Sequence, residues 1–252
     1  VLHTAINRLI EPLIDPMLGT RSFACRVGKG NARAVLRFYE QLQRMGPKRY
    51  CIKLDVQKYF QSIAHQKLMS KLQSALPDDS LENLLKDLMQ SHEAYGILER
   101  GIPIGNLTSQ IFANFYLSEL DQLACQLLEL DFFEDHQEAH AGYMRYMDDM
   151  VILTRDKKKA FAVANQLIET AKNDLRLTIP PHKKIPLSND PVPFLGFVLN
   201  HDGHRVLRRN ERKFRKNLKR LDKKKALPSE KAHVLQSYMA WREIPNARSS
   251  QN

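Results

Sequence analysis

Two adjacent carboxylates interrupt an apolar segment of the chain, in the stretch YMDDMVIL at residues 146–153. The residues on either side are aromatic, β-branched or long and apolar, so Asp148 and Asp149 fall where a hairpin of two strands should turn. Asp is favoured in turns for a purely structural reason, because its side chain hydrogen-bonds its own backbone. The pair alone is therefore consistent with a plain turn or with a site that binds a cation.

A third carboxylate, Asp55, lies in the stretch CIKLDV at residues 51–56, where every second side chain is apolar. This period of two predicts a strand with Asp55 near its carboxyl end. If that strand neighbours the hairpin in one sheet, Asp55 comes beside Asp148 and Asp149. Three such acids repel one another unless divalent cations bind them. Oxygen ligands suit Mg²⁺, and two such ions can hold the attacking and leaving oxygens of a phosphoryl transfer.

The positive charge of the chain is concentrated near its end. The formal net charge is +11, and residues 205–225 contain twelve Lys or Arg against two acids, a net of +10. Phe214, Leu218 and Leu221 recur there at helical spacing, which predicts a helix with one apolar stripe and basic faces. Such a run can be a plain solvated surface. Concentration of the imbalance in one element favours a surface for a polyanion such as nucleic acid.

The elements that must hold these residues are predicted from hydrophobic periodicity. A second hairpin is expected in VPFLGFVLNHDGHRVL at residues 192–207, turning at Asp202-Gly203. Strands interrupted by helices indicate an α+β fold, in which helices back an antiparallel sheet, with a separate helical part after about Arg205. The first predicted helix covers residues 1–18 and ends near Pro16, the second runs from a cap at Ser62 to about Leu76, and the third runs from a cap at Asp79 or Ser80 through Leu88. A long helix is predicted around Phe112, Phe115, Leu120, Leu123 and Leu127. Two more are predicted, one over residues 161–175 and a last one after Pro228, capped by Ser229.

Composition limits the class of protein. With 252 residues, of which 43% are hydrophobic, the chain can bury a sizeable core. No stretch approaches the ~18 consecutive apolar residues of a membrane span, and the charged start does not resemble a signal peptide, so a cytoplasmic location is expected. Cys25, Cys51 and Cys125 form no metal-binding pair. The chain begins with Val, and we expect it to be part of a longer protein.

Four motifs follow one another along the chain: KLDVQKYFQSI, GIPIGNLTSQ, YMDD and FLGF. Together they resemble the successive motifs of a reverse transcriptase over about residues 21–200. SFACRVGKG and IGNLTSQIFANFYL further resemble the enzymes of bacterial diversity-generating retroelements, which copy a template RNA into adenine-mutagenised cDNA. Retron and group II intron enzymes are close relatives and stay open as alternatives, as does a catalytically silent RNA-binding relative.

The resemblance implies an RNA-directed DNA polymerase, a nucleotidyltransferase with a right-hand fold. Fingers and palm would occupy residues 1–204, with an antiparallel palm sheet, and a short basic helical thumb would occupy 205–252. The implied partners are an RNA template, a DNA or RNA primer, dNTPs and a basic accessory protein, without a membrane. Relatives carry further fingers sequence before VLHTAIN. We expect no maturase, endonuclease or DNA-binding region after the thumb, which would disfavour the group II intron alternative.

The same resemblance assigns roles to individual residues. Asp55 and Asp148 would bridge two Mg²⁺ ions, for which Mn²⁺ can substitute, with Asp149 as a supporting catalytic acid. The carbonyl of Val56 would bind the nucleotide-side ion. Ile104 stands where related polymerases of higher fidelity carry Gln. The nucleotide site would consist of Phe60, whose ring would exclude a 2′-hydroxyl, with Ile104, Gly105, and Lys183 or Lys184. Ser109-Gln110 would open the supporting helix. Primer and template would contact Arg26, Lys29, Tyr146, the primer grip Phe194-Leu195-Gly196, and Lys216, Lys219 and Arg220.

Overall fold

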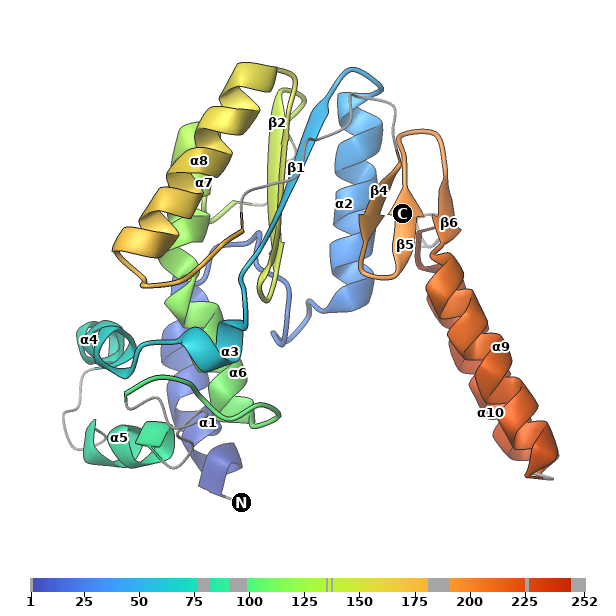
Figure 1. Ribbon diagram of the computed structural model, residues 1–252, viewed down its shortest axis with the longest axis horizontal. Coiled ribbons are helices and arrows are strands. Elements are labelled where there is room, and N and C mark those ends of the chain that lie inside the picture. Colours follow the sequence, from blue (N-terminus) through green and yellow to red (C-terminus); the bar gives the residue numbers. More distant parts are fainter. Residues whose placement is uncertain are drawn as a thin grey trace.

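The protein is described by a computed structural model that covers residues 2–76, 82–90, 99–134, 136, 138–180, 191–224 and 227–245. A three-stranded antiparallel sheet stands at its centre, with helices on both sides (Figure 1). Its strands are β1 (Tyr50–Asp55), β2 (Ala141–Tyr146) and β3 (Asp149–Thr154), in the order β1-β3-β2. The two strands that carry the carboxylates, β1 and β3, are therefore neighbours.

The helices surround the sheet and extend below it in Figure 1. In chain order they are α1 (Leu2–Ile14), the short 3₁₀ helix η1 (Asp15–Met17), α2 (Asn31–Met45), α3 (Tyr59–Ser62), α4 (His65–Ala75), α5 (Glu82–Gln90), α6 (Leu107–Tyr116), α7 (Ser118–Leu128), α8 (Lys157–Asn173), α9 (Arg208–Lys223) and α10 (Pro228–Arg242).

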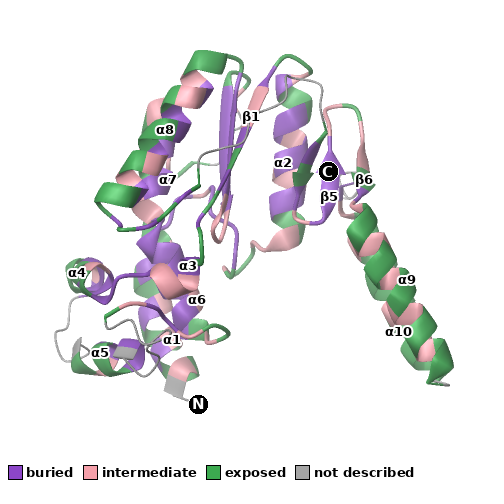
Figure 2. Cartoon of the chain, viewed as in Figure 1, coloured by how far each residue is buried: buried purple, intermediate pink, exposed green. Residues whose placement is uncertain are grey.

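The side chains of the central sheet alternate between two faces. Leu54 and Ile152 are buried in a core formed with α7 and α8, which contact the sheet from one side. Val151 and Leu153 are buried in a second core on the other face, where α2 packs. Figure 2 shows the strands buried between these layers. Both faces of the sheet are therefore covered.

A second, smaller antiparallel sheet lies beside α2. It consists of β4 (Val192–Phe194), β5 (Phe197–Leu199) and β6 (His204–Val206), in that order. Phe194 is buried against Phe38 of α2, with ring centroids 4.7 Å apart. This contact joins the small sheet to the core that α2 shares with the central sheet.

Helices α9 and α10 form a hairpin that projects away from both sheets (Figure 1). They meet through Phe214 and Tyr238, whose rings stack with centroids 3.7 Å apart. Trp241 of α10 packs on Phe197 of β5, at 4.5 Å between centroids, and so fixes the base of the hairpin to the small sheet. Both helices are mainly exposed (Figure 2), as the basic composition of α9 predicts.

The predicted α+β fold with antiparallel sheets is confirmed. The strand ending at Asp55, the hairpin at Asp148-Asp149 and the basic helix all lie where periodicity predicts them. The first helix ends at Ile14 and passes into η1, close to the predicted end near Pro16. The predicted cap of α5 at Asp79 or Ser80 lies outside the described residues. Among the described helices, none combines the length and the apolar character needed to cross a bilayer.

Two predicted helix starts are wrong. The Ser62 hydroxyl caps no helix, because it donates to the carbonyls of Gln57 and Lys58, and the chain turns once more before α4 begins at His65. Helix α10 begins one residue before Ser229, at Pro228, a favoured residue type for the first helical position. The Glu230 carboxylate accepts a hydrogen bond from the backbone N–H of Leu227 and so satisfies this end of the helix.

Three other differences concern the number of elements. The predicted long helix is two helices, because the chain breaks at Leu117, where the Ser118 hydroxyl donates to the Phe115 carbonyl and competes with the helical ladder. Helix α2 has no counterpart among the predicted helices. The second hairpin turns near Asp202-Gly203 as predicted, but it has a further turn at Leu195-Gly196, which separates β4 from β5. Strand β6 also extends past the predicted domain boundary at residue 204, and that boundary stays a prediction.

Candidate active site

The three carboxylates of the sequence motifs meet at one end of the central sheet. Asp55 is the last residue of β1 and pairs in register with Asp149, the first residue of β3. Tyr146, the last residue of β2, is the other neighbour of Asp149, so that Met147 and Asp148 form a two-residue turn. The predicted proximity of the two segments is thus explained by antiparallel pairing of β1 with β3.

The acids at this end of the sheet influence one another electrostatically. Loss of water around Asp55 raises the pKa of its carboxyl, and the charge of Asp149 raises it further. Burial likewise raises the pKa of Asp148; a bond from its own backbone opposes this, while the charges of Asp55 and Asp149 add to it. Lys53, two residues before Asp55 on the same face of β1, places its Nζ 3.5 Å from Asp149 Oδ1. A bound cation would relieve the remaining repulsion.

The chemistry of this donor set fits a hard divalent cation. The available ligands are carboxylate oxygens, together with the carbonyl of Val56, whose side chain is buried behind the strand. Within the described ranges, no three or more His, Cys, Asp or Glu side chains come close enough together to hold a metal ion. Mg²⁺ is commonly bound through one or two carboxylates, with water and substrate phosphates as its other ligands. Two of these acids would therefore suffice, and the assignment of Asp55, Val56, Asp148 and Asp149 as metal ligands stays a prediction.

The loop that carries Ile104 and Gly105 is fixed beside Phe60. The backbone N–H of Ile102 donates to the carbonyl of Phe60 at 2.9 Å, and that of Gly101 donates to Ile63 at 2.8 Å. The half-buried Phe60 packs against the core with its ring edge-on to Tyr59. Direct backbone pairing therefore brings together Phe60 and the loop of Ile104, the two predicted parts of the nucleotide site.

Ile104 and Gly105 are accessible at the tip of this loop. Ile104 is 69% exposed, so its side chain does not pack beneath the loop. Gly105 has φ +99°, a region that L side chains rarely adopt. Ser109 and Gln110 lie in the first turns of α6, which begins at Leu107 after Asn106. The predicted Lys183 and Lys184 lie outside the described residues.

His65 is a residue of this region that the sequence motifs do not indicate. Its imidazole is buried, and Nε2 lies 2.6 Å from the carbonyl oxygen of Gly101, while its backbone N–H donates to Glu99. Both contacts hold the start of the loop that carries Ile104. A single His at the start of an apolar helix is a weak sequence signal for a structural role. Only the pairing of residues 60–65 with 99–102 shows that His65 holds the loop.

The predicted primer grip is a tight turn. Leu195 and Gly196 both have positive φ, 43° and 96°, as in the type I′ turns that join two adjacent strands. A Cβ on Gly196 would lie 2.6 Å from the amide nitrogen of Asn210 and 2.7 Å from the ring of Trp241. Leu195 and the half-buried Tyr146 pack against the same core, so the turn and the carboxylate hairpin share one support.

Arg26 and Lys29, the predicted template contacts of the first loop, are engaged inside the protein. The guanidinium of Arg26 binds the Asp15 carboxylate, with Nε 2.6 Å from Oδ1, and also donates to the carbonyls of Gly19 and Leu18. A template phosphate would have to displace these bonds. Lys29 lies over the ring of Phe23, at 5.2 Å, and donates to the Thr20 carbonyl. The structure therefore gives both cations an internal role.

Lys216, Lys219 and Arg220 of α9 are exposed, in contrast. An open groove between α9 and α10 is lined by Lys213, Lys216 and Arg220 on one side and by Tyr238 and Trp241 on the other. Basic side chains beside aromatic rings are the combination that single-stranded nucleic acids bind. The groove begins at the Leu195-Gly196 turn, where Asn210 and Trp241 lie against Gly196.

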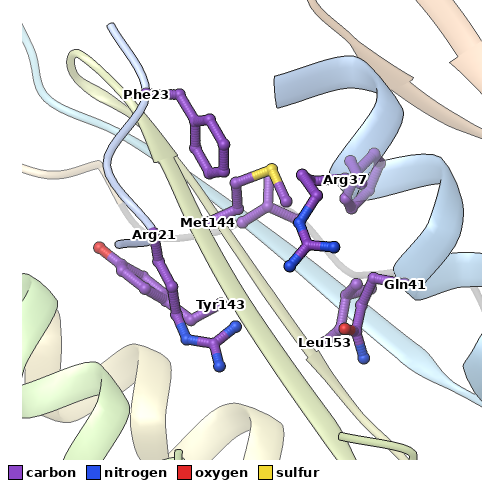
Figure 3. A pocket seen from close by; sticks show the side chains of 9 residues that line it. Arg21, Phe23, Arg37, Gln41, Tyr143, Met144 and Leu153 are labelled. Carbon is purple, nitrogen blue, oxygen red and sulfur yellow. The ribbon is translucent and has the colours of Figure 1, made fainter. Parts of the chain in front are cut away.

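A small cavity lies farther along the sheet, between α2 and the strands (Figure 3). Its volume of about 10 Å³ leaves space for no more than a single water. Figure 3 shows Phe23, Met144 and Leu153 around it, with Arg21 and Arg37 at its sides. A substrate cannot enter so small a space, and we assign the cavity to packing.

Comparison with known proteins places these features in a family. The family model for "Reverse transcriptase (RNA-dependent DNA polymerase)" matches residues 1–199. Protein YkfC of Escherichia coli strain K12 is 24% identical over 241 residues, which cover 84% of this chain and 61% of YkfC. The retron Ec73 reverse transcriptase of Escherichia coli is 27% identical over 205 residues, which cover 77% of this chain and 61% of that enzyme. Both curated relatives are therefore longer than this chain.

Among solved structures, apo telomerase from Candida tropicalis has a TM-score of 0.60 at 10% identity, covering 81% of this chain and 40% of the telomerase. At so low an identity the likeness shows the fold alone. That fold includes the fingers and palm arrangement expected for the segment matched by the family model.

Proposed function

Since this chain belongs to the reverse transcriptase family, we propose that it is an RNA-directed DNA polymerase, which extends a primer along an RNA template. The observation that carries the proposal is the register of β1 with β3, because it places Asp55 beside Asp149 and next to the turn that holds Asp148. Its substrates would be dNTPs, paired with an RNA template and joined to a DNA or RNA primer.

The protein groups have separate tasks in this proposal. Asp55 and Asp148 would hold two Mg²⁺ ions, with Mn²⁺ as a substitute, and Asp149, close to Lys53, would support them. When bound there, the ions supply positive charge to the attacking and leaving oxygens of the nucleotidyl transfer. Phe60 and the loop at Ile104 and Gly105 would shape the pocket of the incoming nucleotide.

Primer extension tests the proposal directly. The protein is incubated with an RNA template, an annealed primer, dNTPs and Mg²⁺, and elongated primers are resolved by length. We expect extension that requires both the RNA and the divalent ion. A protein that binds the template-primer but extends nothing, with Mg²⁺ or with Mn²⁺, would instead support the alternative of a catalytically silent RNA-binding relative.

We further propose that the enzyme is error-prone and serves a diversity-generating retroelement. The motifs IGNLTSQIFANFYL and SFACRVGKG carry this proposal, together with the exposed Ile104. The similarity to the retron Ec73 enzyme favours a retron as the second candidate. A template repeat and a variable repeat beside the gene would identify the retroelement. A basic accessory protein and a cytoplasmic location belong to the same proposal.

Ile104→Gln should lower misincorporation about threefold to tenfold, most visibly opposite template adenines, with little loss of correct extension. A Gln amide can hydrogen-bond and brace the nucleotide pocket, whereas Ile offers only shape and apolar contact. One hydrogen bond contributes roughly 0.5–1.5 kcal/mol, which corresponds to that range of discrimination. The measurement is the error rate in cDNA that both proteins copy from one RNA.

Leu9→Gln is the matched control for this change, because Leu9 is likewise an exposed aliphatic side chain but lies on α1. Its error rate should equal that of the unmodified protein. An Ile104→Gln protein with an unchanged error rate at adenines would remove Ile104 from the fidelity argument and weaken the retroelement assignment with it.

A further inference from the structure

A buried guanidinium lies directly beneath the carboxylate turn. Arg145, in β2, is 0% exposed, and it forms a two-pronged ion pair with Asp121 of α7. Its Nε lies 2.7 Å from Asp121 Oδ1, and one terminal nitrogen lies 2.6 Å from Oδ2. The other terminal nitrogen donates to the backbone carbonyl of Met147 at 2.9 Å. Arg145 thus connects a helix of the core to the residue that precedes Asp148.

The remaining donors of Arg145 bind Asn114 of α6. One bond reaches the Asn114 side-chain oxygen and another its backbone carbonyl, each at 3.1 Å. With the two bonds to Asp121 and the one to Met147, all five guanidinium donors have acceptors. The amide of Asn114 in turn donates to the Ala24 carbonyl at 2.7 Å, which fixes its orientation. The guanidinium is therefore held in one geometry.

Met147 has a backbone conformation that needs such support. Its φ is +57°, in the left-handed region, which costs a residue with a Cβ roughly 1–2 kcal/mol. The carbonyl that accepts from Arg145 belongs to the peptide unit joining Met147 to Asp148. Fixing this carbonyl fixes the plane of that peptide unit, and hence the direction in which the Asp148 side chain leaves the backbone.

We infer that Arg145 is a positioning residue for the reaction, which holds the turn so that Asp148 keeps its place beside Asp55. The inference rests on the proposed function, because only then does Asp148 stand at the reacting atoms. Placement errors of about 1 Å in an active site can cost a hundredfold in rate. The ion pair with Asp121 fixes the position of the guanidinium, and the bond from the guanidinium to the Met147 carbonyl fixes the turn.

Arg145→Lys tests the inference, with Tyr143→Phe as its matched control. Lys keeps the charge but, as a compact point charge, cannot span Asp121 and the Met147 carbonyl together. Tyr143 donates to the same Asp121 oxygen at 2.7 Å, from the same strand, without contacting the turn. Both changes should lower Tm, since both disturb one buried network.

Three measurements separate positioning from stability. For Arg145→Lys we expect kcat for primer extension to fall at least about tenfold, with the Kd for template-primer and the KM for dNTP unchanged. We also expect faster hydrogen exchange of the backbone amides at residues 147–149. Tyr143→Phe should leave both kcat and this exchange as they are. Equal kcat and equal exchange in the two variants would overturn the inference.

Two further arms cover the cases in which the first comparison fails. If Arg145→Lys does not fold, Asp121→Asn replaces it: loss of the anchoring charge should lower kcat and speed exchange at the turn, and unchanged values would contradict the inference. If the unmodified protein extends no primer, the proposed function fails, and with it the catalytic meaning of Arg145. The exchange measurement then still decides whether Arg145 holds the turn.

Discussion

Asp148→Asn should reduce primer extension at least about a hundredfold while leaving RNA binding nearly intact. The carboxylate lies in the two-residue turn between β2 and β3, next to the paired Asp55 and Asp149. Replacing it removes one charged oxygen ligand, and with it stabilisation of the charge that develops during transfer. Affinity for RNA depends mainly on phosphate contacts elsewhere. Extension rate and RNA affinity are therefore measured on the same preparation.

Asp174→Asn is the control for this variant. It makes the same chemical change at an exposed residue that follows α8 and is not part of the turn. We expect wild-type extension from it. Substantial extension by a pure preparation of Asp148→Asn would contradict the assignment of Asp148 as a metal ligand, whatever the result for RNA binding.

Neutralising Lys216, Lys219 and Arg220 together, each to Gln, should weaken template-primer binding and flatten its dependence on salt. Each phosphate contact adds about one unit to the slope of log K against log salt, so the slope should fall by up to about three. All three side chains are exposed on α9, and Lys216 and Arg220 line the groove that starts at the Leu195-Gly196 turn. The measurement is a series of binding titrations at increasing salt.

A variant with Lys157, Lys158 and Lys172 changed to Gln controls for the loss of net charge. These residues are exposed on α8, which covers the other side of the central sheet. The control should keep nearly the full salt slope. If the α9 variant also keeps it, the basic run is a solvated surface and α9 does not track the nucleic acid.

Local periodicity was enough to predict the parts of the fold in which one face of an element is buried. Alternation in β1 and the apolar runs around Asp148 predict the strands that the structure contains. The pairing of β1 with β3, by contrast, depends on contacts between distant segments. The sequence alone therefore predicts only that the three carboxylates meet if these two strands are neighbours. The family resemblance rests on the order of the four motifs along the chain, which local periodicity does not take into account.

The errors come from side chains that compete with the backbone. Ser62 and Ser118 both bond to nearby carbonyls, so one caps no helix and the other follows a helix break. Helix α2 escaped prediction although Phe38, Leu42 and Met45 recur at helical spacing within it. This periodicity begins directly after the basic loop that ends at Gly30.

Charge is the least predictable part of the candidate site. Arg26 and Arg145 are both arginines near sequence motifs, yet each is engaged within the protein, on Asp15 and Asp121 respectively. A sequence states that a side chain is cationic, but not whether its partner is a carboxylate of the same chain or a phosphate. Only the position of the acidic residues in the folded chain decides this.

The packing of Trp241 against Phe197, above the turn at Gly196, gives the protein an optical property. The sequence contains a single Trp, so all of its indole fluorescence comes from the joint between the α9–α10 hairpin and the small sheet. Indole emission responds to contact with water and to neighbouring rings. The unlabelled protein therefore carries its own spectroscopic reporter at this joint, and a change in emission on adding template-primer would signal movement of the hairpin relative to the small sheet.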